Sequence, residues 1–199
     1  MTYTILVTGA NKGIGYEAVK LLSIRKPSAN ILLGSRSIQN GNDAIKKMKF
    51  SNPSHPFSNI QVLEIDVTSP SSLSTAAEHV KSTYHSLDSL IHNSGISNLN
   101  GDSKHPAIFD VNIRGAHDTI TTFLPLITPK TGKITVVSSQ VGAWYQHLLD
   151  SNVKNQFEDI DGATWDKVEG WMQDWERFAA GEESKEKWVP LDQGMVAFK

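Results

Sequence analysis

The chain has 199 residues, a formal net charge of −2 at pH 7 and no cysteine. Its length predicts one domain over residues 1–199, since single domains typically have roughly 100–200 residues. The absence of cysteine excludes disulfides and thiolate metal sites, and the nearly balanced charge gives no indication of nucleic acid or an anionic membrane as a partner.

The N-terminal stretch MTYTILVTGA has neither the basic region nor the long apolar core of a signal peptide. No apolar run in the chain approaches the roughly 18–20 residues that a membrane-spanning helix needs. The sequence therefore predicts a cytoplasmic protein without a membrane partner.

Short apolar runs alternate with helical patterns along residues 1–139. The predicted strands are Tyr3 to Thr8, Asn30 to Ser35, Ile60 to Val67, Leu87 to Gly95 and Gly132 to Ser139. Between them, apolar residues recur at helical spacing in stretches that begin near Ile14, Ile38, Pro70 and Phe109. Strands that alternate with helices of this length predict an α/β fold with a parallel sheet and right-handed crossovers.

Residues 140–199 depart from this alternation. All five tryptophans of the chain lie between Trp144 and Trp188. Trp165, Val168, Met172 and Trp175 fit one face of a helix over residues 163–179, and Gly181 is a plausible stop. No sixth strand follows, so this part is predicted to be a Trp-rich helical segment after the fifth strand.

A glycine-rich stretch, TGANKGIG, runs from Thr8 to Gly15 between the first strand and the first helix. At such a junction, backbone N–H groups and the start of a helix face outward together and bind phosphate. Gly9 permits the turn, Gly13 permits close approach of a ligand, and Gly15 permits the helix to pack on the strand. The alternative is an ordinary tight turn.

Five motifs in sequential order resemble the short-chain dehydrogenase/reductase family, and TGANKGIG resembles the carbonyl-reductase branch of that family. The others are LEIDVTS (63–69), HNSG (92–95), FDVNIRG (109–115) and ITVVSSQVG (134–142). The resemblance covers almost the whole chain and implies a doubly wound Rossmann-type sheet with strand order 3-2-1-4-5.

The resemblance also implies which residues bind a nicotinamide cofactor. They are Gly9, Asn11, Lys12, Gly13, Ile14, Gly15, Ser35, Arg36, Asp66, Val67, Asn93, Ser94, Gly95 and Lys199. Asp66 stands where the aspartate of the family meets the adenine.

The stretch GSRS (34–37) after the second strand bears on the choice of cofactor. NAD is usually bound there by an acidic residue that accepts the ribose hydroxyls, and this chain has none. Arg36 could bind a 2′-phosphate through its guanidinium, with Lys12 as a second cation. We therefore expect NADP(H) in preference to NAD(H); the alternative is that Arg36 is a solvated surface charge.

The implied catalytic residues are Asn112, Ser139 and Lys199. In the family a tyrosine precedes the lysine by four residues and exchanges a proton with the substrate carbonyl. Here that position holds Met195, whose thioether has no such proton. Tyr145 is a substitute donor to consider, although an aromatic residue in this segment is more simply explained by packing.

The chain ends on Lys199, inside the helix that the family has after its fifth strand, so we expect a C-terminally shortened member. The family's later strands, which support part of the substrate pocket, have no counterpart here. The edge of the fifth strand would then be covered by the Trp-rich segment or by a partner chain, or the chain has been truncated; the sequence leaves these alternatives open.

Three functions remain open at this point. The first is a carbonyl reductase-like oxidoreductase that uses NADP(H) on a small or hydrophobic carbonyl or alcohol. The second is a non-redox enzyme, such as a cyclase, isomerase or dehydratase, on the same scaffold. The third is a binding or regulatory pseudoenzyme. We expect a small-molecule substrate and no metal site, and a homo-oligomer is compatible with the family.

Overall fold

The computed structural model describes residues 2–97, 105–186 and 188. The chain divides into two compact units, Met1–Val137 and Ser138–Lys199, and each is described by itself. That the two units make up a single domain, as the length suggests, stays a prediction.

The first unit contains a five-stranded sheet in the order β3-β2-β1-β4-β5, and every neighbouring pair of strands is parallel. The strands are β1 (Thr4–Val7), β2 (Asn30–Ser35), β3 (Ile60–Glu64), β4 (Ser89–His92) and β5 (Lys133–Val136). The predicted fold class and strand order are confirmed.

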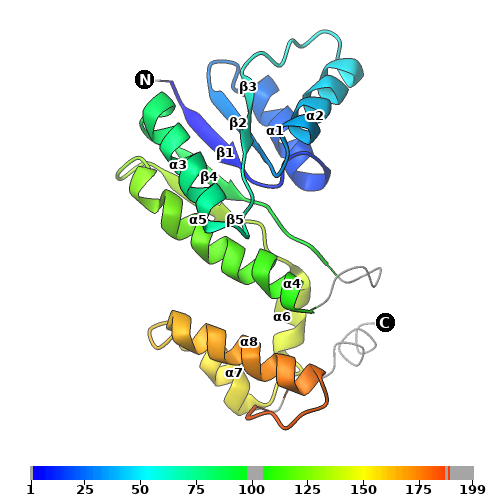
Figure 1. Cartoon of the computed structure of the whole chain (residues 1–199), viewed down its shortest axis with the longest axis vertical. Helices are drawn as coiled ribbons and strands as arrows, with labels where there is room; N and C mark the ends of the chain where they lie inside the picture. The colour runs from blue at the N-terminus through cyan, green and yellow to red at the C-terminus, as the bar shows by residue number, and fades with distance from the viewer. Residues whose placement is uncertain (1, 98–104, 187, 189–199) are drawn as a thin grey trace. The chain divides into compact units, whose positions relative to one another are not determined.

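Helices cover the sheet on both faces (Figure 1). The helices of this unit are α1 (Gly13–Arg25), α2 (Ile38–Ser51), α3 (Pro70–Tyr84), α4 (His105–Phe109) and α5 (Gly115–Phe123), with the short 3₁₀ turn η2 (Leu124–Leu126) after α5. Figure 1 shows α1 and α2 on one face of the sheet and α3 and α5 on the other.

Two apolar cores follow from the alternation of side chains along each strand. Ile5, Val7, Ile31 and Leu33 are buried together with Val19 of α1 and Met48 of α2, among others. Leu6, Leu32 and Leu90 are buried on the opposite face with Leu73 of α3 and Phe123 of α5. Because both faces are covered, the strands appear in the sequence as nearly continuous apolar runs.

Several predicted elements differ from the observed ones at their ends. The fourth strand stops at His92 rather than Gly95, because the backbone N–H groups of Asn93 and Ser94 bond to Thr8 instead of extending the sheet. The third stops at Glu64, since the chain turns at Asp66. The stretch predicted as a single helix from Phe109 contains a π-helical turn, η1 (Asp110–Arg114).

The second unit contains three helices among its described residues: α6 (Gln140–Gln146), α7 (Ser151–Glu158) and α8 (Trp165–Ala179). The predicted helix over residues 163–179 is confirmed as α8, which starts two residues later because the side chain of Thr164 caps it by accepting from Lys167 N. Gly181 has φ +78°, and Glu182 N donates to Arg177 O at 2.9 Å. This is a Schellman-type helix end, so the predicted stop is confirmed.

Aromatic side chains form the core of the second unit. Leu149, Val153 and Trp188 are buried, and Trp171, Trp175, Phe178 and Tyr145 pack against them. The indole Nε1 of Trp171 donates to Gln156 Oε1 at 3.2 Å. Trp171, Trp175 and Trp188 therefore contribute to a core of their own; that the Trp-rich segment also covers the edge of β5 stays a prediction.

A buried carboxylate, Asp174, fixes the segment that follows α8. It is 2% exposed and accepts hydrogen bonds from Lys185 N (2.8 Å), Glu186 N (2.9 Å), Trp188 Nε1 (3.0 Å) and Arg177 Nη2 (3.0 Å). Burial alone would raise the pKa of Asp174, but these four hydrogen bonds outweigh it and the pKa is lowered. The charged carboxylate is therefore the form that ties residues 185, 186 and 188 to α8.

Candidate functional site

The carboxyl ends of the parallel strands bring most of the predicted cofactor-binding residues to one edge of the sheet. Ligands in doubly wound folds bind at this edge, outside the strand ends. The segments that meet there are the glycine-rich loop after β1, residues 34–37 after β2, residues 66–69 after β3 and residues 93–97 after β4.

The glycine-rich loop depends on glycine at two positions for different reasons. Gly9 has φ +61°, which disfavours any residue with a Cβ, and an added Cβ would lie 2.9 Å from the Cα of Ser94. At Gly15 an added Cβ would collide with the side chain of Asn93 and lie 3.0 Å from the Cα of Ala10. The loop and the end of β4 are therefore packed directly against each other.

Helix α1 starts without a side-chain cap. Its N-cap residue, Lys12, makes no capping hydrogen bond, and the first turn has no acidic residue. In contrast, Ser37 and Ser69 cap α2 and α3 by accepting from backbone N–H groups. Uncapped N–H groups and the positive end of the helix dipole attract anions. The first turn of α1, where Ile14 is 71% exposed, therefore fits a phosphate, and half-exposed Asn11 lies in the same loop.

Thr8 and Asn93 hold the glycine-rich loop to the end of β4. The Thr8 hydroxyl oxygen accepts from the backbone N–H groups of Asn93 and Ser94, both at 3.0 Å. In return, Asn93 Nδ2 donates to the carbonyl oxygens of Thr8 (3.1 Å) and Gly9 (3.2 Å). We call these four hydrogen bonds the loop clamp. The side chain of Asn93, predicted to bind the cofactor, is thus used to position the loop.

The end of β2 leaves one cation exposed. Ala10 N donates to Gly34 O at 2.8 Å, which fixes the loop against this strand. Ser35 is 2% exposed and its hydroxyl donates to Ser37 O at 3.0 Å, so this side chain shapes the turn. Arg36 is exposed and has no ion-pair partner within residues 2–97, 105–186 and 188. Its guanidinium is available for a ligand.

Asp66 and Val67 form the turn between β3 and α3. Asp66 Oδ1 accepts from the backbone N–H of Thr68 (2.9 Å) and from its hydroxyl (2.8 Å). Val67 is buried, and an added Cβ at Gly115 would lie 2.9 Å from its Cγ2. Val67 therefore packs against the start of α5.

The side chain of Asn112 is engaged with the loop after β4. Its Nδ2 donates to Ile96 O at 2.8 Å and its Oδ1 accepts from Ile96 N at 2.9 Å. Asn112 lies in η1, where Gly115 N donates to Asp110 O, and such π-helical turns often occur at functional sites. Gly95 lies next to this contact, since an added Cβ there would be 3.5 Å from Asn112 Oδ1. The predicted role of Asn112 in proton transfer stays a prediction.

Two further candidates belong to the second unit. Ser139 is exposed and its hydroxyl accepts from Val141 N at 3.2 Å, at the start of α6. Tyr145 is half-buried and packs against the aromatic core of that unit. Met195 and Lys199, the predicted tyrosine position and catalytic lysine, lie outside the described residues.

A buried histidine at the end of β4 was missed as a candidate from the sequence. His92 is 2% exposed, and neither ring nitrogen has a hydrogen-bond partner of good geometry in the described part of the chain. Burial lowers the pKa of His92 below its ordinary value of 6.5, with a smaller opposing effect from the backbone of Ser94. His92 is therefore a neutral ring directly before the loop clamp. Its only signal in the sequence is its place in HNSG.

No group of His, Asp and Glu side chains that could hold a metal is found within the described residues. Likewise, none of the described helices combines the length and the apolar character that crossing a membrane requires.

The family model described as short chain dehydrogenase matches residues 3–149. The chain belongs to the short-chain dehydrogenase family. This family binds a nicotinamide cofactor and acts on small molecules, and the predicted resemblance is confirmed.

Individual relatives are more distant. Carbonyl reductase [NADPH] 1 of Mus musculus is 33% identical over 141 residues, which are 68% of this chain and 48% of the relative. Short-chain dehydrogenase/reductase 1 of Saponaria officinalis is 27% identical over 210 residues, 92% of this chain and 68% of the relative. A short-chain dehydrogenase/reductase of Aspergillus fumigatus is 33% identical over 95 residues, and there the chain spans only 35% of the relative.

Among solved structures, the menthone neomenthol reductase from Mentha piperita has a TM-score of 0.78 at 21% identity, with 96% of this chain and 78% of that chain covered. Salutaridine reductase from Papaver somniferum has a TM-score of 0.75 at 21% identity and covers 90% of this chain and 71% of its own. At this identity the likeness supports the fold alone.

The loop clamp makes a first prediction. Asn93→Ala removes both donors to the carbonyl oxygens of Thr8 and Gly9, so the first unit should lose about 1–3 kcal/mol of unfolding free energy. Hydrogen exchange of residues 8–15 should also become faster. Urea unfolding and exchange mass spectrometry measure these effects. Asn42→Ala, on the exposed side of α2, is the control and should change neither; equal exchange in both variants would contradict the clamp.

His92 makes a second prediction, on pH. Because its pKa is lowered in the folded protein, the unfolded state binds more protons, and the unfolding free energy should fall as pH drops below about 6.5. The stability linked to His92 is fully present above that pH. His92→Leu should reduce this dependence, as followed by urea unfolding at several pH values. His79→Gln, an exposed change on α3, should retain it, and an unchanged slope in His92→Leu would count against the assignment.

Proposed function

We propose that the chain is an NADP(H)-binding, carbonyl reductase-like member of its family that acts on a small or hydrophobic carbonyl or alcohol. The single observation that carries this proposal is the uncapped N-terminus of α1. Its N–H groups follow a glycine-rich loop, its N-cap residue is Lys12, and no acid lies in its first turn. This arrangement fits the pyrophosphate of a dinucleotide.

The preference for NADP(H) is supported by charge. Arg36 is exposed directly after β2, and the stretch GSRS has no acidic residue to accept ribose hydroxyls. Arg36 would bind a 2′-phosphate with its planar guanidinium and Lys12 would add a second positive charge. The printed name of the mouse relative, carbonyl reductase [NADPH] 1, agrees with this choice.

The remaining predicted residues take roles around the cofactor. Asp66 has one carboxylate oxygen engaged with Thr68, which leaves the other to accept from an adenine amino group. Asn93 positions the glycine-rich loop, and Asn112 positions the loop after Gly95. Ser94 and Gly95 would line the cofactor with their backbone, and Lys199 would contact the nicotinamide ribose.

The chemistry divides between the cofactor and the chain. Bound NADPH would supply a hydride to the carbonyl carbon. The chain must hold the carbonyl oxygen, for which Ser139 is the proposed donor, and must deliver a proton to that oxygen as the alcohol forms. Lys199 would provide positive charge near this proton donor. Met195 cannot be the donor, and Tyr145 is the first substitute to test.

Met195 also favours a second candidate function. A family member without the phenol at this position could retain the pocket for a non-redox step such as cyclisation, isomerisation or dehydration. It could also be a binding or regulatory pseudoenzyme.

We further propose a cytoplasmic location for the protein. A homo-oligomer is a second proposal, which follows from the family.

Cofactor preference makes a third prediction. The chain should bind NADPH more tightly than NADH, and Arg36→Ala should weaken NADPH binding by roughly 10-fold, as expected when a charge-assisted bidentate contact is lost. NADH binding should not change, since it has no 2′-phosphate. Titration calorimetry with both cofactors measures this. Arg25→Ala, an exposed arginine in the last turn of α1, is the control, and equal NADPH affinity for Arg36→Ala and the parent would rule out the proposed contact.

The missing phenol makes a fourth prediction. NADPH-dependent reduction of a reactive dicarbonyl or quinone should be slow in the parent chain, and Met195→Tyr should raise it by up to about 10²–10⁴-fold, the usual contribution of a positioned proton donor. Met195→Phe, which adds the same ring without the hydroxyl, is the control and should bring no gain. Fast reduction by the parent that Tyr145→Phe abolishes would identify Tyr145 as the donor. NADPH binding without gain in Met195→Tyr would favour the non-redox or binding function.

A further inference from the structure

Positive charge is concentrated in one stretch of the first unit. Residues 12–51, which include α1 and α2, contain eight basic and two acidic residues, although the whole chain has a net charge of −2. Both acids are already paired, Glu17 with Lys20 at 3.4 Å and Asp43 with Lys46 at 3.1 Å. The layer that contains α1, α2 and the loops beside them is therefore electropositive, in a chain that is otherwise acidic.

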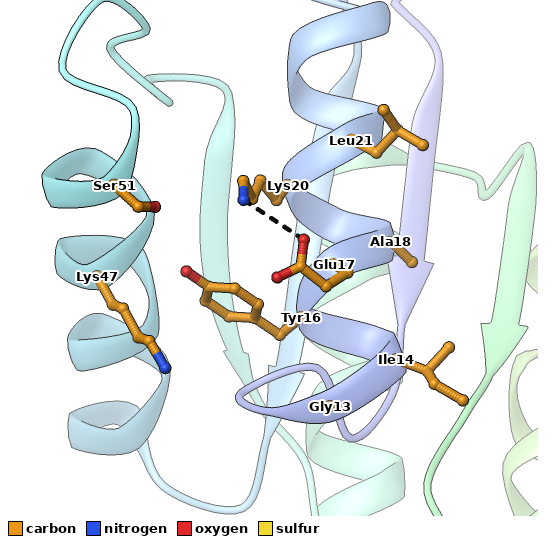
Figure 2. A pocket seen from close by; sticks show the side chains of 9 residues that line it. All are labelled: Gly13, Ile14, Tyr16, Glu17, Ala18, Lys20, Leu21, Lys47 and Ser51. Carbon is orange, nitrogen blue, oxygen red and sulfur yellow. Dashed lines mark hydrogen bonds and ion pairs between the residues drawn. The ribbon is translucent and has the colours of Figure 1, made fainter.

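A hollow of about 780 Å³ opens on this layer. Its lining is Gly13, Ile14, Tyr16, Glu17, Ala18, Lys20, Leu21, Lys47 and Ser51. In Figure 2, Tyr16 reaches from α1 into the space between the two helices, and Lys47 and Ser51 project from α2 on the other side. Side chains from both helices therefore converge on one place.

The groups between α1 and α2 are suited to an anion. The Lys47 ammonium lies 5.6 Å from the centroid of the Tyr16 ring, a cation–π contact that holds the charge in place. Across the described ranges, Lys47 has no ion-pair partner, unlike Lys46 beside it. The ring of Tyr16 is buried, with 7% of the residue exposed, and its hydroxyl donates to no acceptor that the structure describes. The oriented Lys47 ammonium and the unused Tyr16 hydroxyl donor are therefore present together between α1 and α2.

We propose that this hollow binds a phosphate monoester, with the Lys47 ammonium and the Tyr16 hydroxyl as its donors. A phosphate monoester carries close to two negative charges and several acceptor oxygens, which an ammonium group and a phenol bind together. Lys20 also lines the hollow, but its charge is paired with Glu17. Gly13 lies in both the glycine-rich loop and the lining of the hollow. Because the proposed function assigns the 2′-phosphate of NADP(H) to Arg36 and Lys12, which do not line the hollow, the phosphate in the hollow belongs to a separate phosphorylated molecule.

The experiment titrates the full chain with inorganic phosphate at constant ionic strength, with chloride as the comparison anion, and follows backbone amide NMR signals of α1 and α2. Phosphate should shift these signals and chloride should not. Lys47→Gln and Tyr16→Phe should each raise the Kd for phosphate roughly 3- to 10-fold, as expected for one partly exposed charge-assisted contact. Tyr16→Phe keeps the buried ring and so keeps the fold. Lys46→Gln, the neighbouring paired lysine, should leave the Kd within about twofold.

A second arm identifies the source of the phosphate. Phosphate should bind equally with and without saturating NADPH, and Lys47→Gln should leave NADPH binding unchanged. Loss of phosphate binding with NADPH but not with NADH would show that the 2′-phosphate occupies the hollow, and would overturn the assignment to a separate molecule. The first arm can be read even if no cofactor binds, which would contradict the proposed function only. An unchanged phosphate Kd in both Lys47→Gln and Tyr16→Phe would overturn the proposal.

Discussion

The loop clamp is the contact on which the candidate site depends. A parallel strand contributes to a binding edge only through the segment that leaves its carboxyl end, and such segments have no sheet hydrogen bonds of their own. In this chain, Thr8 and Asn93 supply those bonds across 85 residues of sequence. The clamp brings Gly9 and Gly15 so close to residues 93 and 94 that a single Cβ cannot be added at either glycine. This close packing fixes the direction in which the uncapped N-terminus of α1 points.

The alternation of strands and helices and the glycine-rich loop could be predicted from the local hydrophobic pattern and from glycine spacing. The strand order could be predicted only because the five motifs resemble a known family. The ends of the strands could not. The sequence pattern extends the fourth strand to Gly95. In the structure, the backbone N–H groups of Asn93 and Ser94 instead donate to Thr8, which is far away in the chain. The π-helical turn at Asp110–Arg114 was missed for a related reason, since apolar spacings of three or four residues are compatible with either helix type over a single turn.

Side-chain roles were harder to predict than positions. Asn93, Asn112 and Ser35 were predicted as ligand-contacting or catalytic from their motifs, and in the structure their polar atoms bond to the backbone of neighbouring segments. Residue type alone does not show whether a side chain contacts a ligand or instead orients the loop that contacts the ligand. Arg36 and Lys47 are different, since both lack an ion-pair partner in the part of the chain that the structure describes. No carboxylate neutralises either charge there, and for this reason the two residues carry the proposals on anion binding.

Nucleotide binding and chemistry are assigned to different parts of the chain, and this separation explains why the function is harder to state than the fold. The glycine-rich loop, Arg36, Asp66 and the clamp all belong to the first unit. Of the residues proposed for the chemistry, Ser139, Tyr145 and Lys199 come after Val137, where the second unit begins, as does Met195 at the tyrosine position. Asn112 alone among the proposed catalytic residues lies in the first unit. A substitution such as methionine for tyrosine at position 195 removes an acid–base group. Cofactor affinity and catalytic rate should therefore respond to different substitutions, and a family member can lose hydride transfer while it continues to bind the dinucleotide.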